Sequence, residues 1–225
     1  IVMEDGRPYV YDATGAVMLH FGGPPTDAMR GSIGRTAFDD YIRNSKVIAV
    51  YDPPPGVDRA KIVAFARHHY AQDTEFDSYF DPDRRDKFYC AKFVALALEA
   101  GGAHPVAMTP MRDNPSLQVV LHWLKIRARQ AVPAAALIRE DRHVVTLSLE
   151  YSPAQIEAYF EIKLELHRRF TADQKLGNVI DWSASSLRWR DEVQQFMTRG
   201  LAAFAGQKLQ SPRSVPDTVQ ALAAE

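Results

Sequence analysis

The sequence predicts an α+β fold, in which a small antiparallel sheet or half-barrel packs on one central helix and a mostly helical C-terminal extension follows. Turn residues and β-branched runs alternate with helical spacing through the first hundred residues, whereas helical spacing dominates the second half. We therefore expect a compact core over residues 1–110, a mostly helical extension packed on it over residues 111–209, and a loosely ordered tail over residues 210–225.

The first half is expected to contain short strands and three helices. The pair Asp5-Gly6 is a strong hairpin signal between two apolar stretches. Residues 21–34, rich in Gly and Pro, are expected to form a loop. The expected strands are residues 2–4, 8–11, 16–20 and 46–51. The expected helices are residues 37–43 with Thr36 as cap, residues 58–72, and a helix that starts near Cys90 and ends at Gly101-Gly102.

The second half is expected to be mainly helical. Apolar residues recur at helical spacing over residues 116–129, 154–169 and 186–205, and only residues 143–149 have the pattern of a strand. Pro133 and Pro153 suit the first positions of helices, where the missing N–H group costs nothing.

Composition excludes several classes of function. The 225 residues are 46% hydrophobic and 24% charged, with a formal net charge of −1, so nothing draws the chain to nucleic acid or to an anionic membrane. The single cysteine cannot form an internal disulfide, and no Cys/His cluster has the spacing of a zinc site. We expect no metal and no cofactor. The oligomeric state stays open.

No apolar run approaches the roughly 20 residues of a membrane helix, so we expect no transmembrane segment. The chain begins at Ile1 and runs directly into a strand-like stretch, as though an upstream segment had been removed. One unpaired cysteine suits the cytoplasm, and it equally suits a bacterial envelope protein cut after its export signal. Both locations stay open.

Cys90 is the most informative residue, because it lies where a polar, acidic loop turns into an apolar helix. A thiol in the first helical turn lies near unpaired backbone N–H groups and the positive end of the helix dipole, and both favour the thiolate. Cys90 is therefore a candidate nucleophile. The alternative is a core thiol, since Cys90 shares a face with Phe93, Val94 and Ala97.

A cysteine nucleophile needs a base, and seven histidines compete for that role. Each of them alone is more typical of a surface or structural histidine. They are His20, His68, His69, His104, His122, His143 and His167.

An acidic and aromatic segment precedes Cys90. The spacing of Asp77, Asp81, Asp83 and Asp86 does not follow the EF-hand pattern, so we expect capping and loop structure rather than a calcium site. Phe76 and Phe80 are expected in the core, and Tyr79 and Tyr89 are candidate substrate-binding residues at the entrance to the thiol.

Several of these segments together are similar to one known family. The segments are Pro8-Tyr9-Val10-Tyr11-Asp12-Ala13, the strand at 46–51, the helix from Asp58, Phe76-Asp77-Ser78-Tyr79-Phe80-Asp81 and Phe88-Tyr89-Cys90. This arrangement, over residues 1–110, resembles the YiiX-like permuted papain-fold hydrolases, which are bacterial relatives of the NlpC/P60 thiol proteases.

The resemblance implies a Cys-His-acid site. In this family the histidine comes first, on a strand that reads Ser-His-Val-Gly, so the implied base lies before Ile1. Asp12 falls at the position of the acidic residue that orients the histidine. Relatives often have Ser-Glu after the cysteine, where this chain has Ala91-Lys92; the Lys92 charge is then expected to support the thiolate. Without an upstream histidine, His20 is the nearest replacement.

The implied activity is hydrolysis or acyl transfer at an amide, ester or thioester. Relatives act on peptidoglycan peptides or on lipid esters and amides, so a small-molecule, peptide or lipid-like substrate is expected. A second hypothesis is a catalytically inactive papain-like binding or scaffolding module. A third is a helical interaction protein with a buried thiol.

Overall fold

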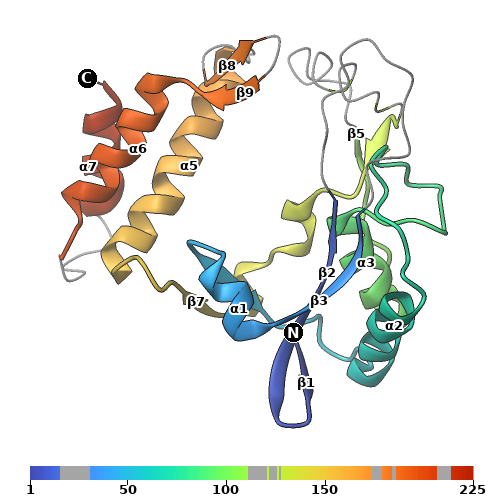
Figure 1. Cartoon of the computed structure of the whole chain (residues 1–225). Helices are drawn as coiled ribbons and strands as arrows, with labels where there is room; N and C mark the ends of the chain where they lie inside the picture. Colours follow the sequence, from blue (N-terminus) through green and yellow to red (C-terminus); the bar gives the residue numbers. More distant parts are fainter. Residues whose placement is uncertain are drawn as a thin grey trace. The chain divides into compact units, whose positions relative to one another are not determined.

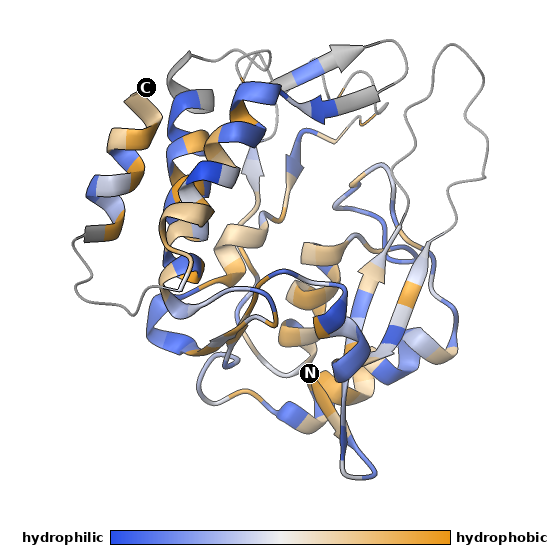
Figure 2. Ribbon diagram, turned by 60° about the vertical axis from the view of Figure 1, so that its left-hand side comes forward, coloured by the Kyte–Doolittle hydropathy of each residue, from blue (hydrophilic) through white to orange (hydrophobic). Residues whose placement is uncertain are grey.

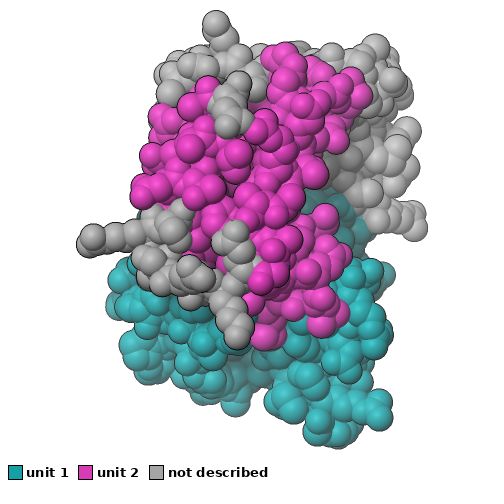
Figure 3. Space-filling view, turned by 90° about the vertical axis from the view of Figure 1, so that its left-hand side faces the viewer, with its two compact units in different colours: residues 1–44, 49–146 teal, residues 45–48, 147–225 magenta. Residues whose placement is uncertain are grey.

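The computed structural model describes residues 1–15, 31–110, 121, 126, 128–173, 179–183, 186–206 and 214–224. The fold is α+β with small antiparallel sheets, as the sequence predicts (Figure 1). Two compact units make up the chain: Ile1–Asn44 with Ala49–Thr146, and Ser45–Ile48 with Leu147–Glu225 (Figure 3).

The first unit contains a three-stranded antiparallel sheet in the order β1-β2-β3, with β1 at Val2–Glu4, β2 at Arg7–Thr14 and β3 at Ser32–Ala37. Asp5 and Gly6 both have positive φ, as a tight hairpin turn requires, and the predicted hairpin is confirmed. Strand β3 begins inside the stretch that was expected to be a loop. Its pairing with β2 provides the backbone hydrogen bonds that local composition does not predict. The expected strand at 16–20 lies outside the described residues.

The carboxylate of Glu4 links the β1–β2 hairpin to the rest of the first unit through hydrogen bonds. Its oxygens accept hydrogen bonds from Tyr11 Oη at 2.6 Å, Arg35 Nε at 2.8 Å and Arg67 Nε at 2.8 Å. These hydrogen bonds, that of Tyr11 first, lower the pKa of Glu4 to about 2. One ionised carboxylate thus joins β1, β2, β3 and the helix that carries Arg67.

Three helices follow the sheet strands in the first unit. Helix α1 spans Phe38–Arg43, α2 spans Arg59–Ala71 and α3 spans Cys90–Ala100. Asp58 caps α2 by accepting from the backbone N–H groups of Ala60 and Lys61. The expected cap Thr36 is instead part of β3, and α1 begins after Ala37 without a side-chain cap. Thr36 therefore pairs in the sheet, although its local preference favours the cap position of a helix.

Helices α2 and α3 approach each other closely at Gly101, which ends α3 as predicted. A Cβ atom at this position would lie 2.6 Å from Ile62 Cγ1, and the Gly101 carbonyl accepts a hydrogen bond from Asp58 N at 2.8 Å. The core beneath these helices includes Ile33, Phe76, Phe88, Tyr89 and Phe93.

The remaining elements of the first unit are short. Strand β4, Ile48–Tyr51, pairs with β7, His143–Leu147, and β5, Thr109–Pro110, pairs with β6, Gln130–Ala131. Two 3₁₀ turns, η1 at Ala134–Leu137 and η2 at Glu140–Arg142, precede β7. The expected helix at 116–129 lies largely outside the described residues.

The second unit is helical around one β-hairpin. Helix α5 spans Pro153–Asp173 and confirms the prediction that Pro153 opens a helix. Strands β8, Ile180–Ser183, and β9, Ser186–Trp189, form the hairpin, and α6, Asp191–Ala203, follows. Residues 186–189, expected to be helical, pair as a strand instead, and the helix starts where Asp191 and Glu192 suit its N-terminal dipole.

Helix α7, Ser214–Ala224, lies in the stretch that was expected to be a loosely ordered tail. Val215 and Val219 of this helix are 2% and 1% exposed and belong to the core of the second unit, with Ala158 and Ile162 of α5. The helices of this unit carry both apolar and polar residues, as amphipathic helices do (Figure 2). Among the described residues, no helix combines the length and the apolar character needed to cross a membrane.

Candidate active site

Cys90 is the first residue of α3, and its side chain is exposed. The alternative of a core thiol is therefore wrong, and the buried residues of α3 are instead Ala91, Lys92, Phe93, Ala95 and Ala97. Phe93 N donates to Tyr89 O at 2.9 Å, as in a regular first turn. The N–H groups that precede Phe93 have no acceptor within the helix, so the thiol lies at the donor-rich end of α3.

Tyr89 fixes the start of α3 from inside the core. Its ring is 1% exposed and lies 5.0 Å from the Phe80 ring, centroid to centroid. Its hydroxyl oxygen accepts a hydrogen bond from Val132 N at 2.7 Å, and burial raises its pKa. The expected place of Tyr89 at the entrance to the thiol is therefore corrected: this ring supports α3 and does not line a surface.

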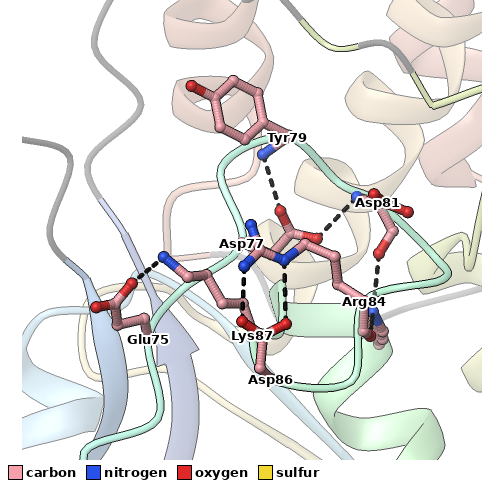
Figure 4. Close-up of polar contacts among 8 residues, drawn as sticks. Glu75, Asp77, Tyr79, Asp81, Arg84, Asp86 and Lys87 are labelled. Atoms are coloured by element: carbon pink, nitrogen blue, oxygen red, sulfur yellow. Dashed lines mark hydrogen bonds and ion pairs between the residues drawn. The ribbon is translucent and has the colours of Figure 1, made fainter. Parts of the chain in front are cut away.

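The loop before α3 is organised by Asp77, which is 1% exposed. Its carboxylate accepts hydrogen bonds from Tyr79 N at 3.1 Å and Asp81 N at 2.7 Å (Figure 4). Burial raises the pKa of Asp77, and these two hydrogen bonds oppose the rise. The acidic segment thus builds a turn. Among the described residues, no group of three or more His, Cys, Asp or Glu side chains could hold a metal ion.

Lys92 closes the same loop from α3. The side chain is 3% exposed, and Nζ donates hydrogen bonds to Asp81 O at 2.8 Å and to Arg84 O. Burial lowers the pKa of Lys92, while the charge of Asp77 opposes that effect. The ammonium group is therefore bound to two loop carbonyl groups. Lys92 was expected to support the thiolate of Cys90, but its hydrogen bonds go to the loop instead.

Tyr79 lies on this loop with its side chain 43% exposed. Its backbone N–H points to Asp77, while its ring projects away from that carboxylate (Figure 4). Of the two tyrosines expected to bind substrate, Tyr79 is the one at the surface.

Asp12 lies on β2 opposite Gly34 of β3. A Cβ atom at Gly34 would come within 2.9 Å of Asp12 Oδ1, so the carboxylate occupies the space that glycine leaves open. Thr14 Oγ1 donates a hydrogen bond to Asp12 Oδ2 at 2.5 Å. These contacts hold the carboxylate on the face of the sheet.

Tyr41 of α1 is half-buried, and its pKa is raised. Helix α1 packs on β2 and β3, and α3 packs on β2. Burial raises the pKa of the half-buried Tyr41, and the charges of Asp12 and Cys90 raise it further. Two residues that are 78 positions apart in sequence therefore both act on one phenol. The helical spacing of Tyr41 with Phe38 is typical of a core residue, so the sequence alone does not distinguish Tyr41 from one.

The described histidines make other contacts. His69 Nδ1 lies 3.0 Å from Thr74 Oγ1, its ring packs on Phe65 and Phe88, and burial lowers its pKa. His143 Nε2 lies 2.8 Å from Thr146 Oγ1. His68 and His104 are exposed, His167 belongs to the second unit, and His20 and His122 lie outside the described residues. Among the described residues of the first unit, no hydrogen bond joins a histidine to Cys90.

Comparisons of the chain with protein-family models, with curated proteins and with solved structures gave no match.

Proposed function

We propose that this protein is a cysteine-dependent hydrolase or acyltransferase with the permuted papain-like fold of the YiiX-like, NlpC/P60-related enzymes. The observation that carries the proposal is the exposed thiol of Cys90 at the first position of α3. The packing of α3 on an antiparallel sheet that contains Asp12 supports the same fold.

In the proposed reaction the Cys90 thiolate attacks the carbonyl carbon of an amide, ester or thioester. The carbon–sulfur bond forms, and the carbonyl electron pair moves onto oxygen. Backbone N–H groups at the start of α3 stabilise that oxyanion. The pair then returns, the leaving group departs with a proton from the base, and water or another acceptor releases the acyl group.

The proposed base is a histidine from a segment that precedes Ile1, with Asp12 as the residue that orients it. Strand β1 pairs with Arg7, Pro8 and Tyr9 of the eight-residue β2. Among the described residues, none pairs with residues 10–14 of β2 on that edge. An antiparallel continuation of β1 would run along this free edge and pass beside Asp12.

The proposed substrate class is a peptidoglycan peptide or a lipid-like ester or amide. This is the substrate class that the family resemblance implies, and Tyr79 is the proposed contact for it. Its exposed ring, on a loop held by Asp77, is suited to packing against a substrate.

A catalytically inactive binding module is the second candidate. It is favoured by one observation, namely that no hydrogen bond joins Cys90 to a histidine among the described residues of the first unit. Such a module would retain the papain-like framework and bind a ligand at the face that carries Cys90.

The reaction of Cys90 with iodoacetamide across pH separates the two candidates. A thiol without activation reacts half-maximally near about pH 8.5. The enzyme predicts a clearly lower midpoint, and the inactive module predicts the ordinary one. The same protein unfolded in urea gives the reference midpoint for the same thiol, and the variant C90S shows that the label is specific.

A further inference from the structure

Phe80 has an unusual backbone conformation in the loop before α3. Its φ is +54°, in the left-handed region that bulky residues rarely adopt. Hydrogen bonds on either side hold this conformation, since the carboxylate of Asp77 accepts from Tyr79 N at 3.1 Å and from Asp81 N at 2.7 Å. Lys92 Nζ also donates to Asp81 O at 2.8 Å. The strain at Phe80 therefore persists because the neighbouring contacts fix the turn.

The ring of Phe80 packs against the residue that precedes the thiol. Glycine would adopt the same φ without strain, so the contacts of the ring must offset the strain at this position. The ring lies 5.0 Å from the Tyr89 ring and 6.2 Å from the Phe76 ring, centroid to centroid. Phe76 is a buried core residue, and Tyr89 is 1% exposed and directly precedes Cys90. The strained residue is thus one ring contact and one peptide bond away from Cys90.

Tyr89 is the cap residue of α3, and its side chain makes no capping hydrogen bond to the helix. A Ser, Thr, Asp or Asn cap would fix the first turn by accepting from its backbone N–H groups. In α3 the cap residue is held through its own side chain instead. Its ring packs on Phe80, and its hydroxyl oxygen accepts from Val132 N at 2.7 Å. The direction of the first turn, and with it the position of Cys90, therefore depends on how firmly the Tyr89 ring is packed.

We propose that Phe80 is a positioning residue, which acts through the ring of Tyr89 to hold the Cys90 thiol at the donor-rich end of α3. This inference rests on the proposed function, in which the Cys90 thiolate is the nucleophile. Phe80 needs no contact with substrate in this role, because its effect reaches the thiol through the first turn of the helix. Without its ring that turn is held less firmly, and the thiolate loses part of the stabilisation by the backbone N–H groups and the helix dipole.

The test measures the pH midpoint for alkylation of Cys90 by iodoacetamide in wild type, F80G and F80L. F80G removes the ring and also relieves the backbone strain, so the loss of one effect is separated from damage to the backbone. F80L keeps most of the apolar volume, and it decides the question if F80G does not fold. The matched control is F65L, because Phe65 is partly buried in the same core and its ring contacts Phe88 and Phe93. Each variant unfolded in urea gives the reference midpoint for its own thiol.

Both Phe80 variants are expected to raise the midpoint of the folded protein toward that of the unfolded chain by at least about half a pH unit, while F65L stays near wild type. A role confined to stability would not move this midpoint in protein that is still folded. Wild-type midpoints in the folded Phe80 variants would overturn the role of Phe80 alone, as would an equal rise in F65L. If folded wild type already has the midpoint of the unfolded chain, the proposed function fails, and this inference fails with it.

Discussion

Lys92 Nζ donates a hydrogen bond to the carbonyl oxygen of Asp81 at 2.8 Å, from a side chain that is 3% exposed. The same ammonium group reaches the carbonyl of Arg84. Lys92 thus ties the loop before α3 to α3 itself, two residues after the thiol. Buried cations are costly unless their hydrogen bonds are satisfied, and here backbone carbonyls satisfy them.

The variant K92M is expected to lose this tie while keeping the length of the side chain. Two carbonyl groups lose a charged donor, which predicts a loss of about 1–3 kcal/mol in the free energy of unfolding. Trypsin is also expected to cleave faster after Arg84 and Arg85. Urea denaturation and timed proteolysis measure the two effects. The control is K61M, whose lysine is exposed on α2; a K92M protein as stable and as resistant as K61M would contradict the assignment.

Glu4 predicts an acid-sensitive hairpin. Its pKa in the folded protein is about 2, below the ordinary value of 4.5. The folded state therefore binds fewer protons than the unfolded chain, so the contribution of Glu4 is fully present above pH 4.5 and is lost as the pH falls toward 2. We expect E4Q to be less stable than wild type at neutral pH and to show a smaller loss between pH 5 and pH 2. Thermal unfolding across this range measures the difference, and parallel curves for the two proteins would rule the explanation out.

The relation of Asp12 to Tyr41 can be measured without any activity. Because the negative charge of Asp12 raises the pKa of Tyr41, D12N is expected to lower it. An NMR titration of the tyrosine Cζ carbon, with Y41F to assign the signal, reports this pKa directly. The control is D39N, which removes an exposed carboxylate from the same helix. If the pKa of Tyr41 shifts no more in D12N than in D39N, Asp12 does not act on Tyr41, and the proposed site loses that support.

Local patterns in the sequence predicted the elements that depend on turn and helix-capping preferences. The hairpin at Asp5-Gly6, the cap Asp58, the end of α3 at Gly101 and the position of Cys90 in the first turn of α3 all follow from turn and capping preferences. The sequence left the exposure of Cys90 open, because its place at the helix start favoured a reachable thiol while its helical spacing with Phe93 favoured a core thiol.

Contacts between distant segments were not predictable in this way. Nothing near Lys92 in the sequence indicates that its ammonium group is buried against Asp81 and Arg84, since lysine usually lies at the surface. Tyr41 has the spacing of a core residue, and the rise of its pKa by the charge of Asp12 arises only when α1 packs on β2. Strand β3 was missed for the same reason, because its partner β2 lies across a long intervening segment.

The measurement that tests the central claim most directly is the rate at which p-nitrophenyl acetate acetylates Cys90, compared with N-acetylcysteine at the same fraction of thiolate. An active site with donors for the oxyanion predicts that the protein reacts faster, by about 100-fold, because the donors stabilise a charge that the free thiol leaves to water. A rate equal to or below that of N-acetylcysteine would contradict the claim that Cys90 is a catalytic nucleophile.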